Sequence, residues 1–406
     1  MKTKYVIILI VSAIFLSCEN TLEFRGRETQ PLLVVNAFVT PDSVVRVHVS
    51  ASRFFLAPDS ARVFDEESGR YVWQKIPFET ISDATVAVTQ NGRFFSMQNI
   101  GGGYYISTEK PDRNGEIHIE VARSGFTTVS ASTSFPQPVP VSVEILNDSI
   151  EHWAWRRLFF DENDVEHEII MSYERRREGV LHIKFSDPPN INNFYRLSIT
   201  ANHYTEDGIF IGRNQLLEPR MLREHLREMA GIPIGNDWTW PLYLEFSDEL
   251  FDGREFSMKF DFWYQNIEHL RPDTTSIVYQ LKDVNDEAYW IWNNWLWLYE
   301  NFRDGSSLNG RGVMGNAKHI DVVVELQSIS REFYLYLHSR EQNRTSGGFF
   351  SEPVPIFNNI NGGIGIFAGY TSSAHQFEVT PERHPNAPPN APVRRLLIEG
   401  FEGWIE

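Results

Sequence analysis

The chain has 406 residues, of which 42% are hydrophobic and 22% are charged, and its formal net charge is −17 at pH 7. This balance is typical of a globular protein and excludes a largely disordered one. The acidic charge disfavours nucleic acid and anionic lipid headgroups as partners. The single cysteine excludes an intrachain disulfide, so packing alone has to stabilise the fold.

Residues 1–17 have the pattern of a secretory signal peptide. Lys2 and Lys4 precede an apolar run over residues 5–16, which is too short for a transmembrane helix of about 20 residues. Cys18 follows Ser17 at the end of this run, as the lipidated cysteine does in the lipobox of bacterial lipoproteins. We therefore expect cleavage before Cys18 and a diacylglyceryl group on its sulfur. An ordinary signal peptide with an incidental cysteine is the alternative.

Residues 18–31 are polar and have no clear period, and we interpret them as a spacer between the lipid and the first domain. Cleavage removes Lys2 and Lys4 and takes the net charge from −17 to −19. Two or three acyl chains would hold the chain at a membrane, at about 0.8 kcal/mol for each buried CH₂ group. No later apolar run is long enough for a transmembrane helix.

Residues 32–135 are predicted to form a small β-sandwich, immunoglobulin-like or carboxypeptidase-regulatory-like. Short alternating runs separated by turn residues are typical of such domains. The runs are 32–39, 44–50, 84–90, 93–97, 101–107, 116–121 and 126–132. Asn91-Gly92 is a strong hairpin signal, because both turn positions require a positive φ. Residues 57–83 break the pattern and predict a long loop or insertion.

The proline-rich stretch 136–140 predicts a semi-rigid link to a second domain. That domain, residues 141–406, is expected to be larger and β-rich with a few helices. Helices are predicted at 218–231, between Pro219 and Gly231, and at 330–342, where Ser330 is the cap. Strands are predicted at 141–145, 167–173, 180–185, 194–200, 241–246, 255–264, 277–281, 319–326 and 394–399.

Aromatic residues make up 14% of the chain and are the most suggestive feature of its composition. The stretch 286–302, for which we favour a helix over a strand, contains Trp290, Trp292, Trp295 and Trp297. Such side chains could stack on sugar rings or anchor a protein partner. The alternative is that they fill the core between wide β-layers.

Catalytic and metal-binding motifs were sought and none is complete. His167-Glu-Ile-Ile-Met171 lacks the second histidine of a zinc-protease helix, and the acidic run 161–166 lacks the glycine and terminal glutamate of an EF-hand loop. The glycines of 363–369 do not have the spacing of a dinucleotide loop and are expected within a strand. We therefore expect no enzyme activity, no cofactor and no metal.

The segment 351–370 includes Glu352-Pro353, Asn361-Gly362 and Gly365-Ile-Phe-Ala-Gly-Tyr370. It resembles the closing signature of a bacterial lipoprotein family, the domain of unknown function 4249. The similarity extends to Leu33-Val-Val-Asn36, and to Asn193-Phe-Tyr-Arg-Leu197 after an Asp-Pro pair. The resemblance implies an outer-membrane location, periplasmic or surface-facing, and a TonB-dependent receptor as partner. It brings no catalytic residue.

Three functions follow as hypotheses. The first is a non-enzymatic, lipid-anchored accessory protein that works with a TonB-dependent receptor in nutrient uptake. The second is a surface module that binds glycan or protein through exposed tryptophans. The third is a hydrolase with an unrecognised pair of carboxylates.

Overall fold

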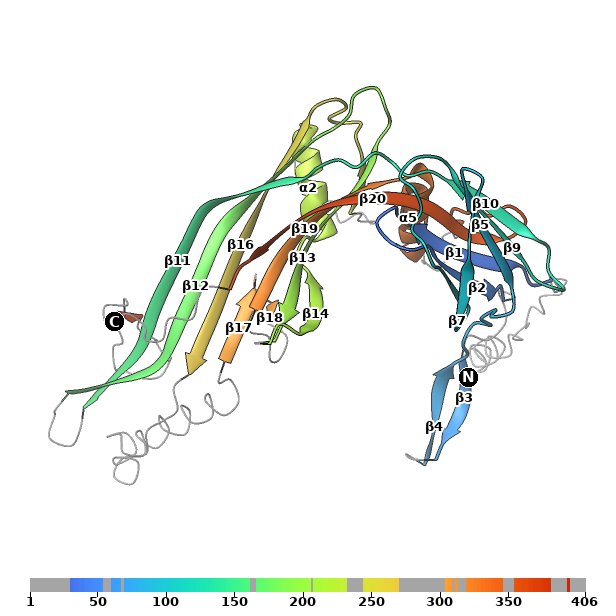
Figure 1. Cartoon of the computed structure of the whole chain (residues 1–406). Coiled ribbons are helices and arrows are strands. Elements are labelled where there is room, and N and C mark those ends of the chain that lie inside the picture. Colours follow the sequence, from blue (N-terminus) through green and yellow to red (C-terminus); the bar gives the residue numbers. More distant parts are fainter. Residues whose placement is uncertain are drawn as a thin grey trace, which may run out of the picture.

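The computed structural model describes residues 30–53, 60–66, 69–160, 166–205, 207–231, 244–269, 304–308, 311–312, 319–345, 354–380 and 393–394. Within these ranges the fold is mainly β, as the sequence predicts, and the helices are α2 (Pro219–Met229) and α5 (Arg331–Thr345). Neither helix is long and apolar enough to cross a membrane. The strands form two sandwiches, which are the two limbs of an arch (Figure 1).

One nine-stranded sheet runs through both limbs. The order along it is β14-β13-β19-β20-β1-β2-β8-β7, and β15 pairs with β13 beside this path. Its strands are β1 (Leu33–Val39), β2 (Arg46–Ala51), β7 (Met97–Gly101), β8 (Tyr104–Ser107), β13 (Phe194–Tyr204), β14 (Phe210–Gln215), β15 (Glu245–Ser247), β19 (His319–Ile329) and β20 (Ile364–Glu378).

The N-terminal sandwich places this sheet against a four-stranded one of order β10-β9-β5-β6. The second sheet consists of β5 (Thr85–Gln90), β6 (Arg93–Phe95), β9 (Ile117–Ala122) and β10 (Val129–Thr133). Alternate side chains such as Val45, Val47 and Val49 are buried between the layers, as the alternation in the sequence predicts. Asn91 and Gly92 have φ values of 52° and 77°, which confirms the predicted hairpin turn.

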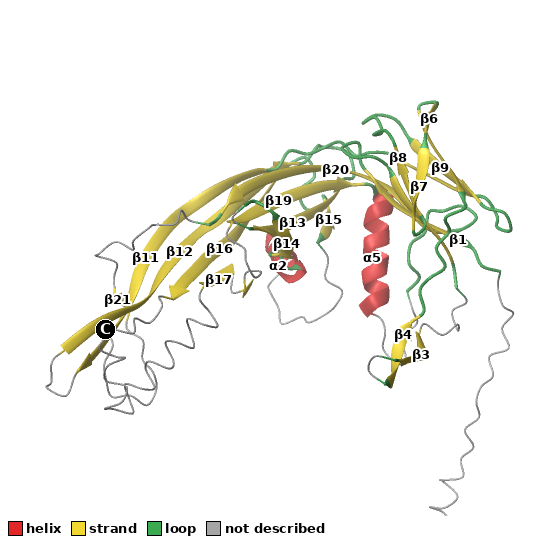
Figure 2. Cartoon of the chain, turned by 60° about the horizontal axis from the view of Figure 1, so that its bottom comes forward, coloured by secondary structure: helices red, strands yellow, loops and turns green. Residues whose placement is uncertain are grey.

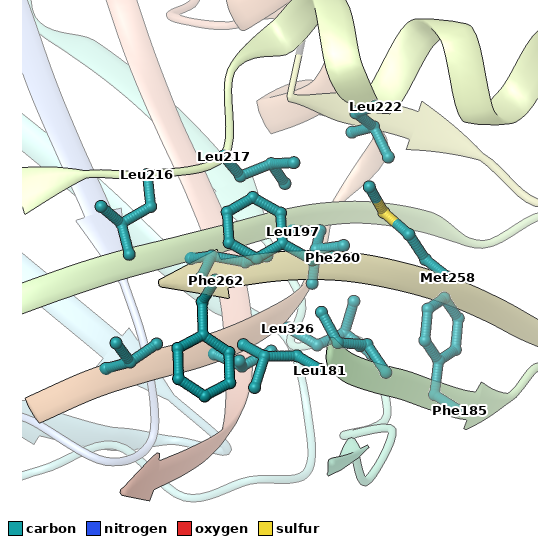
Figure 3. Packing of buried hydrophobic residues seen from close by; sticks show 14 of the residues in the cluster. Leu181, Phe185, Leu197, Leu216, Leu217, Leu222, Met258, Phe260, Phe262 and Leu326 are labelled. Atoms are coloured by element: carbon teal, nitrogen blue, oxygen red, sulfur yellow. The ribbon is translucent and has the colours of Figure 1, made fainter. Parts of the chain in front are cut away.

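The C-terminal sandwich places β13, β19 and β20 against a six-stranded sheet of order β18-β17-β16-β12-β11-β21. That sheet consists of β11 (Ser142–Phe160), β12 (Glu166–Ser186), β16 (Glu255–His269), β17 (Asp304–Leu308), β18 (Arg311–Gly312) and β21 (Val393–Arg394). Figure 3 shows the core between the layers, where Leu181, Leu197 and Phe260 meet and α2 adds Leu222. All four side chains are almost fully buried.

Two predicted strands, 167–173 and 180–185, are a single strand in the structure. The charged residues between them remain paired with β11 and β16 throughout. Gly179 lies where the register with β11 shifts but the ladder with β16 continues, and a Cβ there would lie 2.9 Å from the Phe262 side chain. The predicted strand 277–281, the first half of 241–246 and all but the first residue of 394–399 lie outside the described residues, and the second half of 241–246 contributes to β15.

β20 belongs to both sandwiches, and the predicted boundary at 136–140 is therefore no boundary of the sheet. It pairs in parallel with β1 and antiparallel with β19. Phe367 and the preceding Ile360 are buried in the N-terminal core, although they lie more than 200 positions after that boundary. The proline-rich stretch is itself fixed to β20, because Thr371 Oγ1 donates a hydrogen bond to the Pro136 carbonyl at 3.1 Å.

The helices predicted at 218–231 and 330–342 form close to their predicted bounds, and the helix predicted at 286–302 lies outside the described residues. Pro219 occupies the first turn of α2, and Gly231 follows its end with a φ of 68°. Ser330 Oγ accepts a hydrogen bond from the Phe333 backbone N–H at 3.3 Å and so caps α5. Phe333 and Leu337 bury one side of α5 against β20, and Phe333 stacks on Phe38 of β1 at 4.5 Å between ring centroids.

Residues 57–83, predicted as a long loop or an insertion, contain a β-hairpin that the sequence analysis did not identify. Its strands are β3 (Ser60–Asp65) and β4 (Arg70–Lys75), which pair with each other and with no other described strand. Aromatic and β-branched residues give both strands a high β-propensity, which the turn residues around them obscured. The hairpin projects away from the N-terminal sandwich (Figures 1 and 2).

Candidate docking site

The β3–β4 hairpin carries the densest group of exposed aromatic side chains among the described residues. Trp73 is 74% exposed, Tyr71 60% and Phe64 50%, and Phe78 just after the hairpin is 69% exposed. Scattered exposed apolar residues are normal, but a contiguous group of them marks an interaction surface. We call this group, with Val63 and Val72, the hairpin patch.

Strand register sorts the patch onto two faces. Arg62 lies opposite Trp73 and Phe64 lies opposite Tyr71, so all four side chains share one face, which we call the aromatic face. The Phe64 and Tyr71 rings meet edge to face at 5.2 Å, and the Arg62 guanidinium lies 5.0 Å from the centre of the Tyr71 ring. The other face carries Val63 opposite Val72. Both faces are exposed.

The base of the hairpin is fixed to the start of β1 and the end of β2. In the segment that precedes β3, the Ser52 backbone N–H donates to the Leu32 carbonyl at 2.8 Å. In the segment that follows β4, the Glu79 carbonyl accepts from the Ala51 backbone N–H at 2.9 Å. Arg53 donates to the Pro77 carbonyl at 2.6 Å and lies 5.2 Å from the centre of the Phe78 ring. The hairpin thus leaves the sandwich where the described chain begins.

An isolated two-stranded hairpin is at best marginally stable in water. Here neither face has a sheet or helix behind it among the described elements, and every residue of β4 is exposed. Covering these aromatic side chains would remove a large apolar area from water, since each such residue can bury about 150–250 Å². The arrangement therefore favours a partner that covers the hairpin.

A second polar cluster lies in the loops next to β12 and β13. Asp187, Asp248 and Asp252 place carboxylate oxygens within 4.8 Å of one another. Asp187 accepts hydrogen bonds from the Tyr195 hydroxyl at 2.6 Å and from the Gly253 backbone N–H at 2.9 Å.

A hydrogen bond from the loop before β13 also fixes Asp248 of this cluster. Asp248 accepts from the Asn193 backbone N–H at 2.7 Å. Burial is the main cause that raises the pKa of Asp248. The pKa of Tyr195 is likewise raised above its usual range, first by burial and then by its hydrogen bond to Asp187. These bonds give the cluster a structural role, in which it joins the loop after β12 to the loop before β16.

Comparison with protein-family models places the chain in a family. A family model described as a domain of unknown function (DUF4249) matches residues 19–376, well over half of the chain. The chain belongs to this family. A search of curated proteins finds no match.

The sequence features that indicated the family have structural explanations. Asn359 pairs with Phe367 as a strand residue would, because its side-chain amide donates to the Phe367 carbonyl at 2.8 Å and accepts from the Phe367 N–H at 2.9 Å. A Cβ at Gly363 would lie 2.6 Å from the Leu33 carbonyl oxygen, and one at Gly365 would overlap the Val35 carbonyl. Gly363 and Gly365 are therefore required by the close approach of β1. Asn193 and Tyr195 both donate hydrogen bonds to Asp187.

The predicted site residues lie outside the described part of the chain. This applies to the lipidation site Cys18 and to Trp290, Trp292, Trp295 and Trp297. Sequence reasoning missed the hairpin patch, although a signal for it was present. Phe64, Tyr71 and Trp73 lie within a short stretch, and Tyr71 and Trp73 alternate with period two, which is typical of one face of a strand.

Proposed function

We propose that this member of the family is a non-enzymatic, lipid-anchored binding protein of the outer membrane that works beside a TonB-dependent receptor. The observation that carries the proposal is the hairpin patch, an exposed aromatic surface at the end of the molecule where the spacer joins β1. The lipobox pattern around Cys18 supports the anchor. The receptor is inferred from the family resemblance.

Confinement to one membrane explains why such a protein needs no high-affinity contact. Two molecules tethered to the same surface meet at a raised effective concentration, so even a weak interface is occupied. The nutrient-uptake role of a TonB-dependent receptor would then be assisted by a neighbour that binds and positions, without a chemical step of its own.

A glycan- or protein-binding adhesion module is the second candidate, and the exposed rings of Tyr71 and Trp73 favour it. Flat aromatic faces open to solvent are suited to stacking on sugar rings. The hydrolase hypothesis gains less support. The carboxylates that come closest together in the described residues are Asp187, Asp248 and Asp252, and Asp187 already accepts hydrogen bonds on both oxygens.

Crosslinking in intact cells tests the proposed function. The wild-type chain should fractionate with the outer membrane, and a TonB-dependent receptor should be its dominant crosslinked partner. Cys18→Ala should move the chain to the soluble fraction and reduce that crosslink strongly. A Cys18→Ala chain that remains membrane-bound to the same extent would contradict the anchor, and a glycan as the dominant captured ligand would favour the adhesion module.

A further inference from the structure

We propose that the β3–β4 hairpin enters the headgroup region of the membrane, and that this second contact fixes how the arch stands on the bilayer. The inference deepens the proposed function and rests on its lipid tether for bringing the hairpin to the surface. The ligand is a lipid surface, and the contact residues are Phe64, Tyr71, Trp73, Val63 and Val72.

The side chains of the hairpin match the chemistry of the membrane interface. Tryptophan and tyrosine are enriched at the level of the headgroups, where an apolar ring and a polar edge are both satisfied. Arg62 and Lys75 lie on the aromatic face with Tyr71 and Trp73. Long basic side chains next to an apolar patch can extend toward headgroup phosphates while their aliphatic stems stay against the apolar layer.

The charge of the hairpin also fits a lipid surface better than the rest of the molecule does. Residues 60–75 contain three basic residues and three acidic ones, so this stretch has a net charge of zero, whereas the chain carries −17. The three acidic residues are contiguous at the turn, residues 65–67, whereas Arg62 and Lys75 lie on the aromatic face, so it is this face that can approach a bilayer without repulsion. The driving force is then apolar burial, which is insensitive to salt, and zwitterionic lipid should suffice.

Both faces of the hairpin carry exposed apolar side chains, but in different surroundings. Phe64, Tyr71 and Trp73 occupy the aromatic face, and the other face carries Val63 and Val72 between the pairs Asp65–Arg70 and Ala61–Gln74. The aromatic face is therefore the one that contacts the apolar layer, and the polar pairs of the other face stay at the level of the headgroups and water.

The depth of insertion is limited by the backbone. The outer edges of β3 and β4 pair with none of the other described strands, and unpaired N–H and C=O groups are not tolerated in the hydrocarbon core. At the interface, about 5–10 Å deep, water and headgroups can satisfy them. A strand of six residues is about 20 Å long, so the hairpin can reach this depth while the sandwich stays outside.

The position of the hairpin agrees with the tether. The hydrogen bond between Ser52 and Leu32 places its base at the start of β1, where the spacer 18–31 ends. That spacer can extend to about 50 Å, so the lipid alone would leave the orientation of the arch free. Insertion of the hairpin adds a second point of attachment at the same end, which removes much of this freedom.

The absence of other cysteines permits a direct test on the full-length mature chain. In a Cys18→Ala background, Trp73→Cys carries a polarity-sensitive fluorophore, and Phe94→Cys is the matched control because Phe94 is 77% exposed on β6. Vesicles of phosphatidylcholine, without and with phosphatidylglycerol, are added at low and high salt. We expect a blue shift at position 73 that persists at high salt, and none at position 94.

Co-sedimentation with the same vesicles supplies a second readout. The combined variant Phe64→Ser, Tyr71→Ser and Trp73→Ser should bind at least about tenfold more weakly, because three aromatic side chains leave the interface. Phe94→Ser should bind like the parent. Circular dichroism and thermal unfolding confirm that each variant is folded.

No shift at position 73, or an equal shift at position 94, overturns the proposal. A photoreactive residue at position 73 that captures a protein in cells, while the labelled chain ignores vesicles, would instead make the hairpin a protein-docking element. Because the vesicle experiments use the chain without its lipid, their outcome is independent of the anchor. Failure of the anchor would be seen in the fractionation of cells, as equal membrane binding of the wild type and the Cys18→Ala chain.

Discussion

Gly365 lies where β20 approaches β1 too closely for a side chain. Its φ is +126°, and an added Cβ would overlap the backbone of Val35 on β1. Gly365→Ala should therefore disrupt the parallel pairing of β1 with β20 and lower the free energy of unfolding by more than about 3 kcal/mol. Denaturant unfolding followed by circular dichroism measures this loss.

Gly208→Ala is the control for Gly365→Ala. Gly208 also has a positive φ, +76°, but has nothing within 4 Å of an added Cβ. The Gly208→Ala chain should lose only about 1–2 kcal/mol of unfolding free energy, which is the cost of placing an alanine in the left-handed conformation. Equal losses at the two positions would mean that backbone strain, and not the contact with β1, governs Gly365.

Tyr195 is a buried residue whose hydroxyl makes a single strong hydrogen bond. It donates to Asp187, which is itself buried, at 2.6 Å. Tyr195→Phe leaves that carboxylate oxygen with a weaker set of donors and should cost about 1.5–3 kcal/mol of unfolding free energy, the usual range for a bond to a charged group. Tyr71→Phe, on the exposed hairpin, should be neutral within about 0.5 kcal/mol.

The ion pair between Asp148 and Arg177 gives the stability a defined pH dependence. Both guanidinium contacts with the carboxylate are 2.8 Å, and Arg177 also donates to the Glu378 carbonyl of β20 at 2.7 Å. The hydrogen bonds from Arg177 are the main cause that lowers the pKa of Asp148 in the folded chain. Folding therefore favours the ionised form, and this stabilisation is present above the unfolded pKa and is lost as pH falls through the folded one.

Asp148→Asn should thus destabilise the chain by up to about 1 kcal/mol at pH 7, a value limited by the partial exposure of the pair. The difference from wild type should shrink below about pH 4, where free aspartate begins to be protonated. Unfolding curves from pH 3 to 8 (roughly the accessible range) measure it. A difference that stays constant with pH would show that the charge of Asp148 is not what stabilises this junction.

At the scale of elements, the sequence predicted strands and helices well where burial is one-sided. The alternation of Val45, Val47 and Val49 and the cap at Ser330 are local signals, and local signals fix local structure. The β3–β4 hairpin was missed because its apolar residues face no core. The prediction divided the long strand β12 into two, because the charged residues in its middle do not look like strand residues. Their pairing with β11 and β16 keeps them in the strand, and the local sequence does not identify these partners.

The hairpin should be dispensable for stability if its role is docking. Replacing residues 60–75 by a short glycine-serine loop removes no buried core residue, and the change in loop length costs only about 0.6 kcal/mol for each doubling. We expect the free energy of unfolding to change by less than about 1 kcal/mol, measured by denaturant unfolding. A cooperative loss of structure would instead assign the hairpin a part in folding.

At the scale of the whole molecule, the arch is held together by a strand that is distant in sequence. Proline-rich segments such as 136–140 indicate domain boundaries because they cannot join a sheet interior, and this one connects β10 of the N-terminal sandwich to β11 of the C-terminal one. What the sequence could not reveal is that the chain returns from the second sandwich to complete the first. Parallel pairing of β1 with β20 joins segments more than 300 positions apart. The local sequence of neither strand identifies the other as its partner.

The fragment 32–135 should therefore be unstable alone. Without β20 it exposes one edge of β1, and it loses Ile360 and Phe367 from its core. Removal of large buried side chains typically costs about 2–5 kcal/mol each, which is a large part of the stability of a domain of this size. A fusion of residues 357–378 to the C-terminus of the fragment, through a flexible linker, should restore cooperative unfolding.

The matched control is the same fusion carrying Gly365→Ala, which retains the added apolar residues but cannot pair closely with β1. Thermal unfolding followed by near-ultraviolet circular dichroism distinguishes the three chains. Cooperative unfolding of the bare fragment at the temperature of the full chain would mean that β20 only caps a domain that is complete without it. Restoration by the fusion, and not by its control, would establish that the last third of the chain completes the first sandwich.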